Sequence, residues 1–209
     1  GVEFNLTGTN TLTLPDDKTF NTTIGTGTIT SDGDTTADIT IGGDGTITFT
    51  SSGAIGTNTD NLLTSVASLG TSTVSGNVFI TEADGIGLGA VDVGVNDLDI
   101  RAILGNITND GSAVVAGDLT LTVSATNASI GATGAADDIN VTLSGTLTAS
   151  AADGTGGIFV TETGAMSVNT IDAFNGNIEL ESTGAITDAA DADETTDVTG
   201  ADLTIRDST

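Results

Sequence analysis

The sequence predicts an all-β fold, a right-handed parallel β-helix (β-solenoid) with about 20 residues per coil and roughly ten coils. Three observations predict it: a composition rich in strand and turn formers, a short apolar unit that recurs along the chain, and a longer stretch that is nearly repeated. At 209 residues, the chain is long enough for one continuous stack of this kind.

The composition favours many short strands joined by many turns. Thr, Val and Ile suit a pleated, half-buried surface, and Gly, Asn and Asp supply turns, whereas Lys, Gln and Arg are scarce. An acidic chain rich in Gly and Thr could instead be disordered. Hydrophobic residues make up 37% of this chain, however, and they are regularly placed, which argues against disorder.

The recurring unit is a turn residue followed by an apolar residue, any residue and a second apolar residue. Clear copies begin at Asp38, Asn77, Asp97, Asp118, Asp138, Gly157, Asn177 and Asp202. A weaker copy at Asn61-Leu62 fills the long gap between the first two. The alternation has the two-residue period of a strand with one face inward. Further short apolar segments follow each unit, so each coil is expected to hold three short strands.

Stacking would place each strand beside its equivalent in the next coil, about 4.8 Å away and in parallel pairing. The inward Ile, Val and Leu side chains would form columns that no single coil could bury alone. The hexapeptide pattern of left-handed β-helices is absent, and coils of about 20 residues suit the right-handed form better.

A longer stretch that is nearly repeated, which we call the echo, predicts how the coils are organised. The stretch "GNVFITEADGI" from Gly76 returns as "GGIFVTETGAM" from Gly156, so that Val78 corresponds to Ile158. At about 20 residues per coil this distance is four coils, which predicts a duplicated block. The expected organisation is a single solenoid over residues 1–209, with less regular coils in 1–38, blocks at 39–118 and 119–202, and the start of a further coil at 203–209.

The charge is strongly one-sided, with 29 acidic residues against three basic ones and a formal net charge of -26. Nucleic-acid binding is not expected, because it needs Lys and Arg, and insertion into a membrane is not expected, because no run of about 18 apolar residues exists. Self-repulsion of this size is best tolerated where salt or divalent cations screen it, which favours a location outside the cell. Without cysteine the chain can form neither disulfides nor thiolate metal sites.

The strings "GDLTLT", "INVTLSGTLTA", "GIFVTETGA", "GNIELESTGAIT" and "ADLTIRDST" resemble the repeat region of filamentous haemagglutinin-like proteins. These are very long bacterial exoproteins, often exported by two-partner secretion. The resemblance covers about residues 37–209 and is to the shaft, since no export domain is recognisable. It implies a non-enzymatic structural or adhesive shaft segment, secreted or at the bacterial cell surface, with host, cell-surface or matrix receptors as partners.

Two alternatives stay open. Copies of the chain could stack end to end as subunits of an extracellular filament or sheath, because an open end coil leaves backbone groups unpaired. A polysaccharide-acting β-helix enzyme would instead need Arg101 or Arg206 beside an acidic cluster. The chain lacks His and Tyr as proton-transfer groups, so no enzyme is predicted.

Two sets of residues are candidate contact points. The stretch "TDAADADETTD" offers calcium ligands from one loop, and its candidate ligands are Asp188, Asp191, Asp193, Glu194 and Asp197. Their spacing is irregular, so a solvated acidic loop is the alternative, and calcium, the only cofactor considered, is expected to bind weakly. Phe79 and Phe159 alternate with inward residues and are expected to point outward. Each ring would either contact a partner or be covered by a loop from a neighbouring coil.

Overall fold

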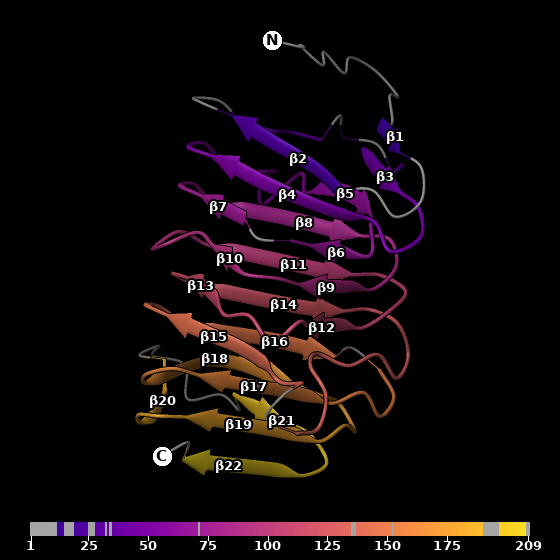
Figure 1. Cartoon of the computed structure of the whole chain (residues 1–209). Helices are drawn as coiled ribbons and strands as arrows, with labels where there is room; N and C mark the ends of the chain where they lie inside the picture. Colours follow the sequence, from indigo (N-terminus) through magenta and orange to yellow (C-terminus); the bar gives the residue numbers. More distant parts are fainter. Residues whose placement is uncertain are drawn as a thin grey trace.

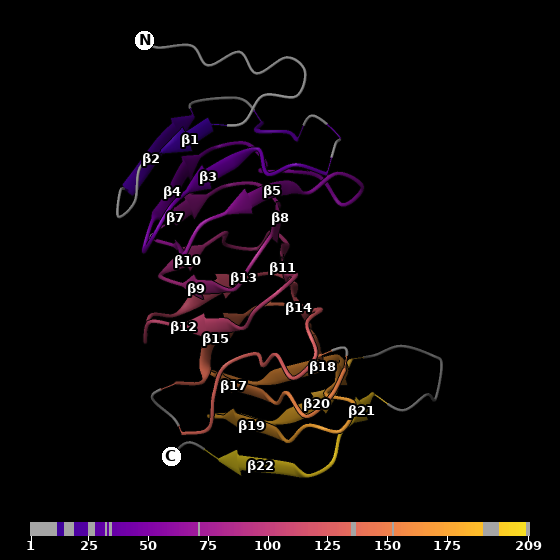
Figure 2. The same ribbon diagram turned by 90° about the vertical axis from the view of Figure 1, so that its right-hand side faces the viewer.

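A computed structural model describes residues 12–14, 19–24, 28–31, 33, 35–70, 72–134, 137–151, 153–189 and 197–207. In these residues the strands stack in parallel into a β-solenoid of about eight turns, with coils about 21 residues apart (Figures 1 and 2). The predicted all-β solenoid is confirmed, although about eight turns replace the ten expected, because several coils are longer than 20 residues. No described segment forms a helix that could cross a membrane.

Each coil contributes strands to two sheets. The first, called sheet A, holds β1 (Leu12–Leu14), β3 (Ile39–Ile41), β5 (Leu62–Ser65), β8 (Val78–Glu82), β11 (Leu98–Ala102), β14 (Leu119–Val123), β16 (Leu147–Ala151), β18 (Met166–Asp172), β20 (Ile186–Asp188) and β21 (Val198–Thr199). The second, called sheet B, holds β2 (Thr19–Ile24), β4 (Thr46–Ser51), β6 (Ser68–Leu69), β7 (Ser72–Val74), β9 (Ile86–Leu88), β10 (Val91–Asp92), β12 (Ile107–Asn109), β13 (Val114–Ala116), β15 (Ile139–Leu143), β17 (Ile158–Glu162), β19 (Ile178–Ser182) and β22 (Leu203–Asp207). In Figure 1 the arrows of β8, β11 and β14 point right and those of β15, β17 and β19 point left, as expected when a coil crosses between sheets and returns.

The core consists of columns of inward side chains, as predicted. In sheet A, Val78, Leu98, Leu119 and Leu147 are in register on four successive strands, and all four are buried. Full burial of such a side chain contributes about 1.5–3 kcal/mol, and here each one is covered by its equivalents in the neighbouring coils. The stack is therefore stabilised by contacts between coils more than within them.

Sheet B divides near its N-terminal end. The first residues of β4 pair with β6, and its last residues pair with β7. At the division the amide of Phe49 donates to the hydroxyl of Ser72 at 3.0 Å, which satisfies a group that the ladder leaves free. The coils from β5 to β13 consequently hold three strands, as predicted, whereas those from β14 to β19 hold two longer strands.

The coil that begins at Leu119 is longer than the sequence predicts. Leu119 pairs with Leu147, 28 residues later, whereas Ile139, which the recurring unit places beside Leu119, lies in sheet B. The additional residues lie between β14 and β15 and include Ile130, which forms a bridge to Ile158. The recurring unit could not show this insertion. Strands of both sheets bury every second residue, so the unit does not distinguish a strand of sheet A from a strand of sheet B.

The echo therefore does not mark four whole coils. Val78 lies in sheet A and Ile158 in sheet B, and the path from one to the other makes three full coils and then crosses to the opposite sheet. The prediction that they occupy equivalent places in the coil is wrong. The blocks predicted at 39–118 and 119–202 accordingly do not repeat as whole coils.

What the echo does repeat is a local arrangement. The amide of Phe79 donates to the carbonyl of Ile55 at 2.8 Å, and the amide of Phe159 donates to that of Ile130 at 2.8 Å. The glycine after each isoleucine has a positive φ, 67° in one case and 68° in the other, which lets the chain turn sharply there. The same corner is thus built twice, once on each sheet.

Candidate functional site

Three carboxylates gather on sheet B near the C-terminal end of the stack. Asp138 immediately precedes β15, and Glu179 and Glu181 lie in β19; one oxygen of each lies within 4.8 Å of the others. Strand β17 separates β15 from β19, so the group spans three successive strands. We call these three residues the acidic triad.

The acidic triad is mostly buried. Asp138 has no exposed surface, Glu179 is buried and Glu181 is half-buried. One oxygen of Asp138, Oδ2, accepts a hydrogen bond from the hydroxyl of Thr161 at 2.8 Å, while Oδ1 is buried without a partner. Nη1 of Arg206, in β22, lies 2.8 Å from Oε1 of Glu179. Burial raises the pKa of Asp138; Thr161 opposes this, the two glutamates add to it, and Arg206 opposes it.

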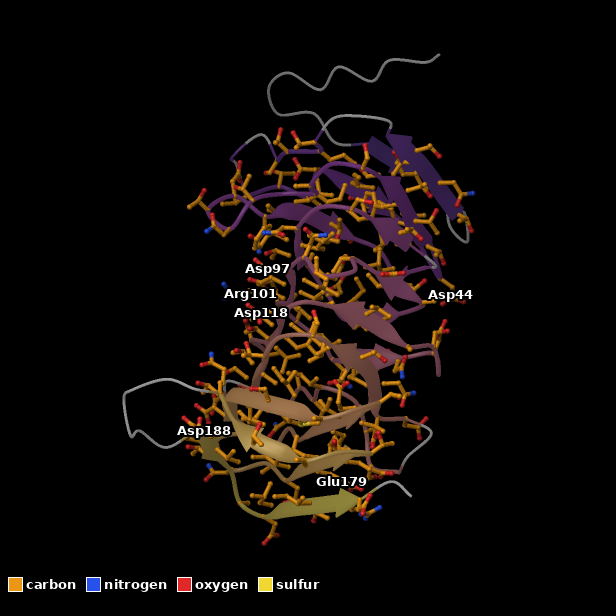
Figure 3. The ribbon with its side chains drawn as sticks, turned by 90° about the vertical axis from the view of Figure 1, so that its left-hand side faces the viewer. Asp44, Asp97, Arg101, Asp118, Glu179 and Asp188 are labelled. Carbon is orange, nitrogen blue, oxygen red and sulfur yellow. The ribbon has the colours of Figure 1, made fainter. Side chains whose placement is uncertain are left out.

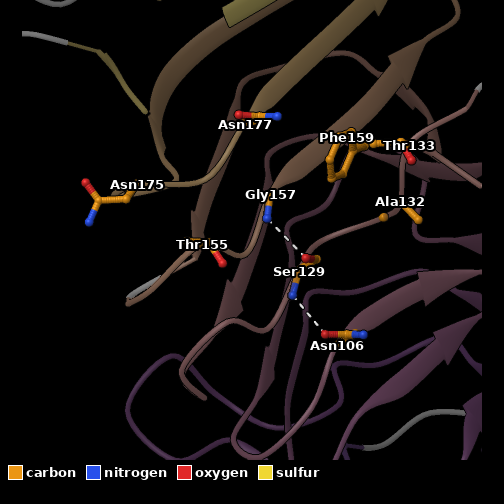
Figure 4. A pocket seen from close by; sticks show the side chains of 10 residues that line it. Asn106, Ser129, Ala132, Thr133, Thr155, Gly157, Phe159, Asn175 and Asn177 are labelled. Carbon is orange, nitrogen blue, oxygen red and sulfur yellow. Dashed lines mark hydrogen bonds between the residues drawn. The ribbon is translucent and has the colours of Figure 1, made fainter. Parts of the chain in front are cut away.

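Phe159 lies beside the acidic triad, in register with Glu179. Its side chain is only 7% exposed, and in Figure 4 its ring stands next to Ala132 and Thr133 of the preceding coil. A Cβ at Gly157 would lie 2.4 Å from the ring, so only glycine leaves room for it. Phe159 therefore offers little surface to a partner, whereas Phe79 is half-buried.

A shallow hollow of about 550 Å³ adjoins Phe159. It is lined by Asn106, Ser129, Gly131, Ala132, Thr133, Thr155, Gly157, Phe159, Asn175 and Asn177, none of them charged. The amide of Ser129 donates to Oδ1 of Asn106 at 2.9 Å, and the amide of Gly157 donates to Oγ of Ser129 at 3.0 Å (Figure 4). These polar groups link three successive coils, so they already have a structural role.

Two buried glutamates, Glu82 and Glu162, are the last residues of β8 and β17. Glu82 accepts hydrogen bonds from the Thr64 hydroxyl at 2.6 Å and the Val66 amide at 3.1 Å. Glu162 accepts one from the Leu143 amide at 3.1 Å through Oε1, and its Oε2 is buried without a partner. Burial raises the pKa of both carboxyls, that of Glu162 to about 7. Both side chains therefore bond to the preceding coil at the point where its strand ends.

The predicted calcium loop is only partly described. Asp188 is the exposed last residue of β20, and Asp197 precedes β21, where its carbonyl accepts from the amide of Ile171 at 2.6 Å. Asp191, Asp193 and Glu194 lie outside the described residues, so calcium binding by this loop stays a prediction. In Figure 3, Asp188 and Glu179 lie on opposite sides of the solenoid, so Asp188 is separated from the acidic triad.

The two arginines have different surroundings. Arg101 donates from Nε to the hydroxyl of Ser124 at 3.1 Å, and Figure 3 shows it in a row with Asp97 and Asp118 along one side. Arg206 does lie beside an acidic group, as an enzyme would require. Its guanidinium is paired with Glu179, and two of the three carboxylates are buried.

The recurring unit does not predict the acidic triad. In that unit Asp138 is a turn residue, and Glu179 lies between the two inward residues of a later copy. The contact between them depends on the long coil after Leu119, which shifts the later strands relative to the recurring unit. The only available signal was that Glu179 and Glu181 share one face of a strand.

Comparison with protein families, with curated proteins and with solved structures found no match to this chain. Its function must therefore be inferred from its fold and side chains.

Proposed function

We propose that the chain is a non-enzymatic shaft segment of a large bacterial protein of the filamentous haemagglutinin-like kind, secreted or held at the cell surface. The observation that supports this most is the continuous stack, in which parallel pairing runs from β1 to β20 in sheet A and from β2 to β22 in sheet B. One unbroken core over this length is what a rigid spacer requires.

Stiffness in this proposal comes from pairing on both edges of each strand. Strand β11, for example, is in register with β8 on one side and with β14 on the other over all five of its residues. Bending or pulling the stack would have to break several of these backbone hydrogen bonds together. The net charge of -26 would keep neighbouring shafts soluble and apart.

The shaft would act by holding other parts of its parent protein away from the cell. Host, cell-surface or matrix receptors are the partners proposed for that protein. Force spectroscopy on the segment, placed between two marker domains, tests the mechanical role. Unfolding in distinct steps at measurable force is expected, and the featureless extension of a disordered chain would contradict it.

A second candidate, the subunit of an extracellular filament or sheath, is favoured by β22. Its residues Leu203 and Ile205 are 50% and 59% exposed, although they are in register with Ile178 and Leu180, which are buried. A further coil packed on β22 would bury both side chains, and its backbone would pair with the free edge of β22. That coil could come from the same polypeptide or from a second copy.

Electron microscopy and sedimentation over a range of protein concentrations separate the two candidates. A shaft segment stays a single particle about 38 Å long, from about eight turns at about 4.8 Å each. A filament subunit forms fibres that grow with concentration and are lost when Leu203 and Ile205 are both changed to Lys. Val95→Lys is the control, because Val95 is 81% exposed and lies away from β22. Cleavage of polysaccharides, with or without calcium, would contradict both candidates.

A further inference from the structure

The acidic triad lacks a balancing charge among the residues that the structure describes. Three carboxylates face one guanidinium, that of Arg206, which contacts Glu179. Of the other basic residues, Arg101 is in β11 and bonded to Ser124. Like charges held this close, and largely out of water, are unfavourable unless a cation or a proton joins them.

Three buried oxygens in or next to the acidic triad have no hydrogen-bond partner. One is Oδ1 of Asp138, on a side chain with no exposed surface. The second is Oε1 of Glu179, which lies 2.8 Å from Nη1 of Arg206 as an ion pair. The third is Oδ1 of Asn109, whose amide nitrogen donates to the carbonyl oxygen of Asp138 at 2.7 Å. The one neighbouring hydroxyl that bonds Asp138, that of Thr161, is already used by Oδ2. Buried polar atoms are nearly always paired, so the unpaired Oδ1 of this fully buried carboxylate indicates a missing positive ligand.

We propose that Asp138, Glu179 and Glu181 bind one Ca²⁺ ion, with Oδ1 of Asp138 as the buried ligand. Calcium accepts only oxygen ligands in these sites, at about 2.3–2.6 Å, so two ligands on opposite sides of the ion lie about 4.8 Å apart. The carboxylate oxygens of the acidic triad lie within that distance of one another. Glu181 is half-buried, which leaves a path for water to complete the coordination and for the ion to enter.

The bound ion would join strands that do not pair directly. Asp138 adjoins β15 and the glutamates lie in β19, with β17 between them. Calcium would therefore clamp three successive strands of sheet B beside the covered ring of Phe159. None of its three ligands belongs to the predicted set at 188–197, and the inference holds whether the chain is a shaft segment or a filament subunit.

A substitution of Arg206 tests the site, because it should strengthen calcium binding. Its guanidinium holds Oε1 of Glu179 and competes with the ion for that carboxylate. The change Arg206→Gln removes one positive charge from the site, so it should tighten calcium binding several-fold. Misfolding cannot produce a gain of this kind.

The test is titration calorimetry with CaCl₂ in about 150 mM NaCl, where the general screening of surface charge is largely saturated. The unaltered chain should show one saturable site and a higher Tm in calcium than in EDTA. Asp138→Asn should weaken binding at least tenfold and abolish the rise in Tm. Asp84→Asn removes an exposed carboxylate from the turn after β8 and should change neither.

Three results would overturn the proposal. The first is the absence of saturable binding, which would mean that the acidic triad holds a proton instead of a metal. The second is equal affinity in the Asp138→Asn variant, the Asp84→Asn variant and the unaltered chain, which would mean that calcium only screens the acidic surface. The third is unchanged or weaker binding by the Arg206→Gln variant.

Discussion

Replacement of Glu162 by Gln should make the chain more stable at alkaline pH. The carboxyl of Glu162 is buried, only one of its oxygens accepts a hydrogen bond, and burial raises its pKa from 4.5 to about 7. A carboxyl whose pKa is higher in the folded state than in the unfolded state contributes to stability when it is protonated. This contribution to the free energy of unfolding is fully present below pH 4.5. That contribution is lost as the pH rises through about 7.

The size of the effect follows from the two pKa values. Between pH 5 and pH 8, the free energy of unfolding of the unaltered chain should lose about 2–3 kcal/mol through Glu162. Gln is neutral at every pH, resembles the protonated carboxyl in shape and still accepts from the Leu143 amide. The Glu162→Gln variant should therefore nearly equal the unaltered chain at pH 5 and exceed it by about 2–3 kcal/mol at pH 8.

Urea denaturation followed by far-UV circular dichroism at several pH values measures this difference. The exposed residue Asp84 supplies the control, since Asp84→Asn should give a difference that does not vary with pH in this way. A gap between Glu162→Gln and the unaltered chain that stays constant from pH 5 to pH 8 would refute the reasoning. Lower stability of the variant at pH 8 would refute it too.

Two further predictions concern the packing of the coils, and a third concerns the net charge. Gly176→Ala should destabilise the chain by about 1–3 kcal/mol or more, because a Cβ there would lie 1.8 Å from the carbonyl oxygen of Gly156. Gly87→Ala should be tolerated, because the atoms nearest to a Cβ at Gly87 are 3.6 Å away. The urea midpoints of the two variants compare these effects. Leu121→Ala should cost about 2–5 kcal/mol in the same assay, because Leu121 is fully buried, and Val95→Ala on the surface less than about 0.5 kcal/mol. Raising NaCl from 10 to about 500 mM should raise the Tm, since it screens a net charge of -26; a falling Tm would show that self-repulsion is unimportant.

The strands themselves could be predicted well from the sequence. The first apolar residue of each recurring unit begins a strand, as Val78 begins β8, Leu98 begins β11 and Ile178 begins β19. The weaker unit at Asn61-Leu62 was also predicted correctly, since Leu62 begins β5. Alternation of apolar and polar residues decides which side chains face inward, and this local information was sufficient.

The pairing of later strands could not be predicted in the same way. Alternation does not say which of two sheets a strand joins, because both sheets bury every second residue. The long coil from Leu119 to Leu147 therefore went unnoticed, and Ile139 was placed in the wrong sheet. The acidic triad depends on that pairing, so Asp138 could not be associated with Glu179 from spacing alone. The handedness predicted for the coil stays a prediction.

Disulfide cross-linking tests the stacked-coil architecture most directly, because the chain has no cysteine of its own. Thr120 and Thr148 are in register on adjacent parallel strands, 28 residues apart in the sequence, while Asn140 lies in the other sheet. Neighbouring strands bring such pairs within the span of a disulfide. The double variant Thr120→Cys with Thr148→Cys should oxidise to an intramolecular disulfide and retain its Tm, and Thr120→Cys with Asn140→Cys should stay reduced. Rapid closure of the second pair and not the first would contradict the coil described here.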